Sequence, residues 1–525
     1  MLIEMSRRAP LYGVPTLLLL LLAPSLAFAQ ALPNINSLRV GYNTRKTAAK
    51  AEGELKAQLD AIDKAIAEAI KLGQAGEVRR QIARGSALLA GTAWTPALDY
   101  QNSLALRSER IVIDSSLPYA LRLEQIYSPS IELTPALTAR VSLRKRVPPP
   151  APGAATPPDE PRARDLGTFD AVSRDLRESP LVMELDMAGA ADGAYLIDTE
   201  VFDGATPLGK TSLGVQLQKG LDARLRALEA GAAKLPEAVR ADVLYPSDFI
   251  RNVNRGRVGL GTFNLTTDVA AAEAVLAAAK AGKDPFKGRT GDMERHYPLA
   301  GAGEIMPYRV FVPKAYTGAT AMPLVIALHG LGGTEDGFFD NYQKLPPQLA
   351  EQHGFLMAGV LGYRSDGFYG SQIMAAGDVA SKRRAEYSEK DVMEVLRLMK
   401  ATYKVDESRI YLLGHSMGAI GAWYLGSAHP DIWAAIVPFS GAGSAATVEK
   451  MKGIPQFVVH GDADNTVNVN GSRTMVAAMK KAGMEVTYIE VPGGSHTDVV
   501  VPNLAKAFDF MAAQRKGAIN TSSKQ

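Results

Sequence analysis

The chain has 525 residues, which corresponds to about three to four domains of ordinary size. Hydrophobic residues make up 46% of the sequence and charged residues 22%, a globular composition that excludes a largely disordered or collagen-like chain. The net charge of +3 is too balanced to indicate nucleic-acid or anionic-membrane binding, and the absence of cysteine excludes disulfides, thiolate metal sites and cysteine nucleophiles.

The N-terminus has the features of a secretory signal peptide. Arg7 and Arg8 form a short basic segment before an unbroken run of leucines, and Ala27 and Ala29 make a small-x-small cleavage signal. The apolar stretch is shorter than the roughly 20 residues that span a bilayer, although an uncleaved anchor is the alternative. We therefore expect residues 1–29 to be removed from an exported protein, periplasmic or secreted, that has no membrane span afterwards.

The region before residue 220 changes from helical to strand-like patterning. Residues 30–95 are predicted to form a helical hairpin, because apolar residues recur at three- and four-residue steps. Residues 96–220 alternate between apolar and polar side chains and are predicted to form a small antiparallel β-sandwich. Within that region, residues 148–161 contain seven prolines and are expected to be an extended, mobile loop or linker.

The remainder of the chain returns to helix and then alternates between strands and helices. Residues 221–285 are predicted to be a helical connector. In residues 286–516, short apolar runs such as 324–328 and 410–413 are separated by helical stretches, which predicts an α/β domain with a mainly parallel sheet. No repeat of about 20 to 50 residues is visible, which argues against a propeller or solenoid. Residues 517–525 are expected to be a disordered tail.

The strongest chemical motif is a G-x-S-x-G sequence, Gly414-His415-Ser416-Met417-Gly418. It follows a predicted strand and precedes a predicted helix, which is the context of a nucleophile elbow. The glycines relieve crowding in the tight turn, and the helix N-terminus lies beneath the developing negative charge. Ser416 is therefore the candidate nucleophile.

A serine nucleophile needs a general base and an acid that orients the base. His496 lies on a glycine-rich loop after the last predicted strand and is the candidate base. Asp464 lies just past a strand and is the candidate acid, which gives the chain order Ser, acid, His. Asp462 is the rival acid and is expected to turn the loop, whereas Asp498 is interpreted as a solvated loop charge.

Two backbone N–H groups are expected to bind the oxyanion. One belongs to Met417, after the nucleophile, and the other to Leu331 in the glycine-rich segment 329–333. Tyr369 and Trp423 are candidates for lining a substrate pocket, although aromatic side chains at such positions are equally typical of a buried core. We expect neither a metal nor a cofactor, because no metal-binding motif is present.

The other six histidines have structural interpretations. All seven histidines lie after residue 295, so any imidazole base must come from the last domain. His415 is expected to pack beside the elbow, and His329 and His460 are expected to brace strand-end loops through hydrogen bonds. The remaining ones are interpreted as surface or packing residues: His296, His353 and His429.

The last 210 or so residues resemble the α/β-hydrolase superfamily. Within it, they look like the secreted esterase and predicted-peptidase group related to polyhydroxybutyrate depolymerases, feruloyl esterases and prolyl-oligopeptidase-type catalytic domains. The matching segments are 323–333 (PLVIALHGLGG), 409–418 (RIYLLGHSMG), 460–467 (HGDADNTV) and 494–496 (GSH). The resemblance implies that Ser416, Asp464 and His496 form the catalytic triad. The chain departs from secreted depolymerases in lacking their cysteines.

These observations predict an exported serine hydrolase that cleaves a small-molecule or polymeric carboxylic ester through an acyl-enzyme. A serine peptidase of the prolyl-oligopeptidase type is the alternative, although such enzymes usually carry a propeller. The third hypothesis is a binding protein with a vestigial hydrolase domain. Polymer binding by the N-terminal domain stays open, because the first 250 residues or so match no family that we can name.

Overall fold

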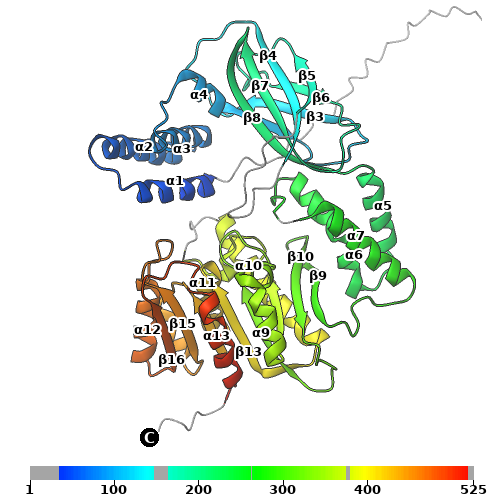
Figure 1. Cartoon of the computed structure of the whole chain (residues 1–525), viewed down its shortest axis with the longest axis vertical. Coiled ribbons are helices and arrows are strands. Elements are labelled where there is room, and N and C mark those ends of the chain that lie inside the picture. The colour runs from blue at the N-terminus through cyan, green and yellow to red at the C-terminus, as the bar shows by residue number, and fades with distance from the viewer. Residues whose placement is uncertain (1–34, 147–162, 262, 374–378, 518–525) are drawn as a thin grey trace, which may run out of the picture. The chain divides into compact units, whose positions relative to one another are not determined.

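A computed structural model describes residues 35–146, 163–261, 263–373 and 379–517 (Figure 1). The predicted signal peptide, the proline-rich segment and nearly all of the predicted tail lie outside these residues. The described chain forms two units, one comprising residues up to Leu217 together with Asn254–Gly256, and the other comprising Gln218–Val253 and the chain from Arg257 onward. In the described ranges, no helix is both long and apolar enough to cross a membrane.

The first unit begins with three helices, α1 (Ile35–Ala49), α2 (Gly53–Lys71) and α3 (Ala75–Leu89). The predicted hairpin corresponds to α2 and α3, and α1 is an additional helix that contacts α3. The apolar residues spaced three and four apart on these helices are buried together. They are Tyr42, Leu59, Ile62, Ile66, Ala69, Val78 and Ile82.

Two sheets follow the short helix α4 (Pro96–Ser103) in the first unit. The three-stranded sheet is antiparallel, with the order β1 (Leu104–Ser108), β3 (Tyr119–Gln125) and β6 (Leu181–Leu185). The five-stranded sheet has the order β2 (Val112–Ile113), β8 (Thr206–Leu217), β7 (Gly193–Asp203), β4 (Leu137–Lys145) and β5 (Arg164–Phe169). Its β2–β8 pair is parallel, in contrast to the antiparallel pairing expected from the sequence. The two strands are not consecutive, so no hairpin turn obliges them to run antiparallel.

The second unit starts with three helices, α5 (Leu221–Ala232), α6 (Glu237–Asn254) and α7 (Leu265–Lys280). All three lie in residues 221–285, the segment predicted to be a helical connector. Pro246 lies inside α6, and an internal proline weakens the helical pattern because it removes a backbone donor. Most of this helical segment belongs to the same unit as the large sheet that follows.

An eight-stranded, mainly parallel sheet forms the centre of the second unit, as predicted. Its order is β16-β15-β14-β13-β11-β12-β10-β9, and the pairs that involve β10 are antiparallel whereas the others are parallel. The strands are β9 (Gly291–Leu299), β10 (Glu304–Val312), β11 (Met322–Leu328), β12 (Leu356–Val360), β13 (Val405–His415), β14 (Ala435–Phe439), β15 (Gln456–Gly461) and β16 (Val486–Val491).

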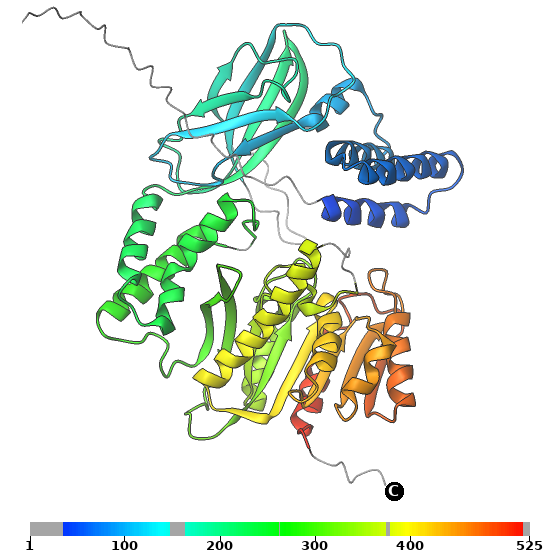
Figure 2. The ribbon, with the colours of Figure 1, turned by 180° about the vertical axis from the view of Figure 1, so that it is seen from behind.

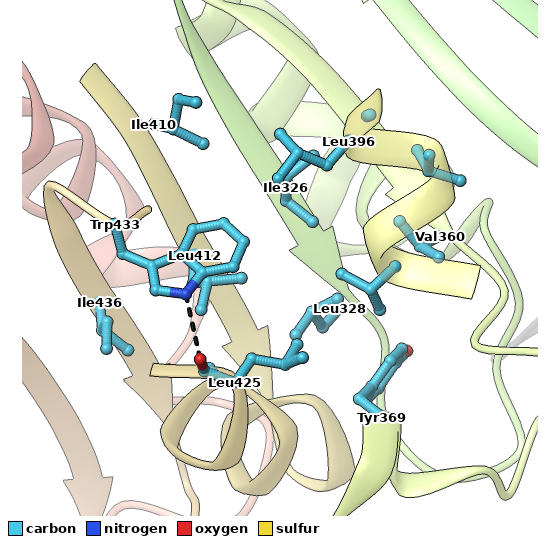
Figure 3. Close-up of a cluster of buried hydrophobic side chains, with 14 of the residues drawn as sticks. Ile326, Leu328, Val360, Tyr369, Leu396, Ile410, Leu412, Leu425, Trp433 and Ile436 are labelled. Carbon is cyan, nitrogen blue, oxygen red and sulfur yellow. Dashed lines mark hydrogen bonds between the residues drawn. The ribbon is translucent and has the colours of Figure 1, made fainter. Parts of the chain in front are cut away.

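Helices cover both faces of this sheet. They are α9 (Leu345–His353), α10 (Val379–Thr402), α11 (Met417–Ala428), α12 (Asn470–Lys481) and α13 (Val501–Ala513), and shorter helical segments are α8 (Gly337–Asp340), η1 (Tyr342–Lys344), η2 (Phe368–Gly370) and η3 (Ala445–Met451). In β11, Ile326 and Leu328 pack in the core with α10 and α11, whereas Val325 and Ala327 pack with α9 and α13. Figure 2 shows α10 (yellow) in front of the sheet, and Figure 3 shows the core on that side. Burial on both faces explains the continuous apolar strand sequences.

Candidate active site

Ser416 lies in the sharp turn between β13 and α11. Its backbone has φ 58° and ψ −116°, a strained conformation for a residue with a side chain. The Ser416 N–H donates a 2.8 Å hydrogen bond to the carbonyl oxygen of Phe439, which ties the turn to the neighbouring strand. A Cβ placed on Gly418 would lie 1.8 Å from the carbonyl oxygen of Leu328. The G-x-S-x-G motif therefore has a steric reason here, because the turn packs directly against β11.

Replacement of Gly418 by alanine is expected to lower the free energy of unfolding by about 3 kcal/mol or more, since the added methyl overlaps backbone atoms that cannot move independently. Urea unfolding of the purified variant measures this change. The control is Gly259→Ala, because a Cβ at Gly259 meets nothing within 4 Å. Equal stability of the two variants would contradict the proposed steric role of Gly418.

Three side chains from separate loops form a continuous hydrogen-bonded chain. Nε2 of His496 lies 2.8 Å from Oγ of Ser416, and Nδ1 of His496 lies 2.7 Å from Oδ2 of Asp464. A carboxylate only accepts hydrogen bonds, so Nδ1 carries the proton and Nε2 presents its lone pair to the serine hydroxyl. This arrangement can take a proton from Ser416.

The acid in this chain is Asp464 rather than Asp462 or Asp498. Oδ1 of Asp462 accepts the Gly493 N–H at 2.6 Å, and Oδ1 of Asp498 accepts the Ser495 N–H at 2.7 Å, so both brace loops.

The environment of Asp464 keeps it ionised. Its Oδ1 accepts the N–H groups of Thr466 and Val467 at 2.7 and 2.9 Å. Burial opposes ionisation, but the hydrogen bonds from His496 and from these two amides outweigh it and lower the pKa of the Asp464 carboxyl. The acid is therefore a charged acceptor that orients His496.

The backbone carbonyl of His496 accepts hydrogen bonds from residues next to the nucleophile turn. Nε2 of His415 lies 2.9 Å from the His496 carbonyl oxygen, and the Ser440 hydroxyl donates to the same oxygen at 3.0 Å. Nδ1 of His415 lies 2.9 Å from the Tyr342 hydroxyl. Burial lowers the pKa of His415 to about 4, so this ring is neutral near pH 7 and is not a second acid. Sequence reasoning placed His415 beside the elbow but missed Ser440 and Tyr342, which lie in distant segments without a motif.

The loop expected to bind the oxyanion lies against the nucleophile. A Cβ placed on Gly330 would lie 3.4 Å from Cβ of Ser416, so the following residue, Leu331, is close to the elbow. Gly332 donates its N–H to the carbonyl oxygen of Ser365 at 2.8 Å. By contrast, the N–H groups of Leu331 and Met417 donate no hydrogen bond to any residue in the described ranges. Two amides are thus available near Ser416.

The expected substrate-binding roles of Tyr369 and Trp423 are wrong, because both side chains belong to the core. Tyr369 lies among the core side chains drawn in Figure 3 and is 0% exposed. Its hydroxyl donates to the His329 carbonyl oxygen at 3.2 Å. Trp423 is 1% exposed, and its Nε1–H donates to Oε1 of Gln456 at 3.3 Å. Within the described parts of the chain, histidines and carboxylates form no group of three suited to a metal ion.

Asp391 of α10 supports the loop beside the oxyanion segment, a role that sequence reasoning missed. The Tyr297 hydroxyl donates to Oδ1 of Asp391, and the Tyr363 N–H donates to Oδ2 at 2.6 Å. Ser365, which accepts the Gly332 N–H, lies two residues after Tyr363. The buried carboxylate thus anchors the loop that in turn holds the glycine-rich segment.

The ionisation of Asp391 is expected to make stability depend on pH. Burial raises the pKa of this carboxyl from 3.8 to about 6. The folded state then binds the proton more tightly than the unfolded state, so its contribution to stability is full below about pH 4 and is lost as pH rises through about 6. When the pH rises from about 4 to above about 6, the free energy of unfolding of Asp391→Asn should therefore fall less than that of the wild type, by up to about 3 kcal/mol.

Urea unfolding at about pH 4 and about pH 8 measures this difference. The control is Asp431→Asn, because Asp431 is exposed. A difference between Asp391→Asn and wild type that stays constant from pH 4 to 8 would contradict the assignment.

The C-terminal part of the chain is similar to known proteins. Residues 301–516 match the family described as "Putative esterase". This part of the chain is similar to the α/β-hydrolase esterase group. The match covers the nucleophile elbow, the glycine-rich segment and the loops that carry Asp464 and His496, and it does not reach the first unit or α5 to α7.

Relatives of the esterase segment match over short stretches. A bifunctional acetylxylan esterase/xylanase from Neocallimastix patriciarum is 26% identical over 146 residues, 28% of this chain and 20% of that protein. A feruloyl esterase B from Talaromyces funiculosus is 25% identical over 142 residues, 26% of this chain and 37% of that protein. The chain thus spans well under half of either relative. A solved ferulic acid esterase from Anaeromyces mucronatus has 17% identity and a TM-score of 0.36, covering 42% of this chain and 90% of that one.

Proposed function

We propose that the protein is a serine hydrolase that cleaves carboxylic esters through an acyl-enzyme. The observation that carries the proposal is the hydrogen-bonded chain from Ser416 through His496 to Asp464, with Ser416 on a strained turn at a helix N-terminus. This combination supplies a nucleophile, a base and an orienting acid in contact. The esterase segment that contains it supports an ester rather than another acyl substrate.

In the proposed reaction, Oγ of Ser416 attacks the ester carbonyl carbon while Nε2 of His496 accepts the hydroxyl proton. The resulting oxyanion is stabilised by the N–H groups of Leu331 and Met417. His496 then returns the proton to the leaving alcohol as the C–O bond breaks. Water repeats the sequence on the acyl-enzyme, which releases the acid and restores the Ser416 hydroxyl. Throughout, ionised Asp464 stabilises the imidazolium form of His496.

The proposal is tested by titrating the purified protein with a fluorophosphonate and locating the label by mass spectrometry. We expect one equivalent on Ser416 and a parallel loss of nitrophenyl ester hydrolysis. A label elsewhere, or ester turnover that survives full labelling, would refute the mechanism. Chromogenic peptides assayed beside short- and long-chain esters separate esterase from peptidase activity, because a peptidase must also protonate an amine leaving group.

The names of the relatives suggest which esters to assay first. One is named for acetylxylan and another for feruloyl esters. We propose acetyl and feruloyl esters of carbohydrates as the initial panel, with unsubstituted alkyl esters for comparison. Export, with removal of residues 1–29, also stays a prediction, and N-terminal sequencing of the protein recovered from the producing cells tests it. Polymer binding by residues 30–285 is tested by sedimentation with insoluble polysaccharide.

A further inference from the structure

Oδ2 of Asp464 lies within hydrogen-bond distance of two imidazoles. Nδ1 of His496 is 2.7 Å from this oxygen, and Nε2 of His460, at the end of β15, is 3.1 Å from it. The side chains of His460 and Asp464 are 0% exposed, so water does not compete for their contact. The proposed reaction uses His496 and leaves His460 without a role.

The surroundings of His460 determine where its proton lies. Nε2 faces two acceptors, Oδ2 of Asp464 and the Val467 carbonyl oxygen at 3.0 Å, and neither has a hydrogen to donate. A lone pair on Nε2 would be repelled by both, so Nε2 carries the hydrogen. Nδ1 lies 2.7 Å from Oγ of Ser472, and the same Oγ lies 3.1 Å from the Gly441 carbonyl oxygen. In a neutral ring whose hydrogen is on Nε2, the single hydroxyl hydrogen of Ser472 goes to Nδ1. Burial lowers the pKa of His460, which agrees with a neutral ring.

We propose that His460 is a positioning residue of the active site, whose Nε2–H holds the Asp464 carboxylate in line with Nδ1 of His496. This rests on the proposed function, because it assigns His460 a role in that reaction through Asp464. The amides of Thr466 and Val467 fix one carboxylate oxygen, and His460 fixes the other. The acid is therefore prevented from rotating about its last side-chain bond.

The second donor also limits the negative charge that Asp464 presents to His496. A carboxylate oxygen that already accepts the His460 N–H offers less negative charge to the imidazolium of His496. Loss of that donor raises the pKa of Asp464 and leaves more negative charge facing the imidazolium that forms on His496. The acid limb of the pH profile of kcat/KM reports the protonation of the base, so it should move to higher pH.

Other titratable groups near His460 do not obscure this limb. Burial lowers the pKa of His415, at the end of β13, to about 4. Glu490 of β16 is paired with His460 in the sheet register, and hydrogen bonds from Arg473 of α12 and Tyr488 lower its pKa to about 2. Neither group changes charge near neutral pH, so the acid limb reports His496.

The test compares three variants of the full chain. His460→Phe keeps a ring and removes the donor, and His460→Gln restores an N–H near the position of Nε2. Ser472→Ala removes the contact to Nδ1, together with the hydrogen bond to the Gly441 carbonyl oxygen, and leaves Nε2 and Asp464 in contact. For ester hydrolysis by His460→Phe we expect kcat to fall about tenfold or more at an unchanged KM. Its acid limb should rise by about half a unit to one unit. His460→Gln should restore most of the wild-type kcat and most of the wild-type position of the acid limb. Ser472→Ala should leave the acid limb at its wild-type pH.

A second measurement is made on the wild-type protein, and it keeps the proposal testable if His460→Phe does not fold. In ¹⁵N-histidine NMR of the wild-type protein, the proton of His460 is expected on Nε2, and assignment by His460→Gln identifies the signal. A proton on Nδ1 alone, or a folded His460→Phe with an unchanged acid limb and kcat within twofold of wild type, would overturn the proposal. Failure of the proposed function is distinct: the wild-type protein would hydrolyse no ester and Ser416 would not be labelled.

Discussion

Replacement of Ser416 by alanine is expected to reduce kcat for nitrophenyl esters by about 10⁴-fold or more. The hydroxyl is the group that Nε2 of His496 contacts at 2.8 Å, and alanine leaves no atom that can form the acyl-enzyme. Initial rates at saturating ester, together with loss of fluorophosphonate labelling, measure the effect. The remaining rate comes from oxyanion stabilisation and substrate positioning by the unchanged parts of the site.

The Ser416→Ala variant should remain folded, so the loss of rate is chemical. The substitution removes one hydrogen bond and keeps a Cβ in the same turn, and the free energy of unfolding should change by about 1 kcal/mol at most. The matched control is Ser427→Ala, a buried serine of α11, the helix that Ser416 precedes; its hydroxyl donates to the Tyr424 carbonyl oxygen at 2.9 Å. We expect the control to keep wild-type activity. If Ser416→Ala retained more than about a hundredth of the activity, the acyl-enzyme mechanism would be refuted.

The nucleophile elbow could be predicted because its signal is local. Two glycines at fixed offsets from Ser416, between a strand pattern and a helix pattern, define a turn that can be recognised without knowing the fold. The contact between Gly418 and Leu328 shows the physical basis of that pattern. The acid and the base could be proposed for a similar reason, because Asp464 and His496 each follow a strand that its apolar run makes recognisable.

Contacts that depend on long-range packing could not be predicted in the same way. Tyr342 and Ser440 meet His415 and His496 from segments 73 and 56 residues away, and nothing in their local sequence marks them. Trp423 was misinterpreted because α11 is buried on nearly every side, so helical periodicity gives no direction for its side chains. His460 was expected to brace a loop through hydrogen bonds. The sequence did not indicate that one of its partners is the Asp464 carboxylate.

Replacement of Asp464 by asparagine is expected to lower kcat by about 10³- to 10⁴-fold, because the amide cannot satisfy its neighbours and orient the base at the same time. Oδ1 of Asp464 accepts two backbone N–H groups, so the amide oxygen of asparagine should occupy that position. The NH₂ group then faces Nδ1 of His496 and donates to it. The proton of His496 moves to Nε2, and that nitrogen can no longer accept the proton of Ser416.

The opposite orientation of the asparagine amide does not rescue the enzyme. It would return an acceptor to His496 and present the NH₂ group to the N–H groups of Thr466 and Val467, which leaves donors facing one another. Asp462→Asn is the matched control, because this carboxylate accepts the Gly493 N–H and does not touch His496. Steady-state kinetics of both variants decide between the two acids. A large loss in Asp462→Asn with little loss in Asp464→Asn would show that the hydrogen bond between Asp464 and His496 is structural and that the orienting charge lies elsewhere.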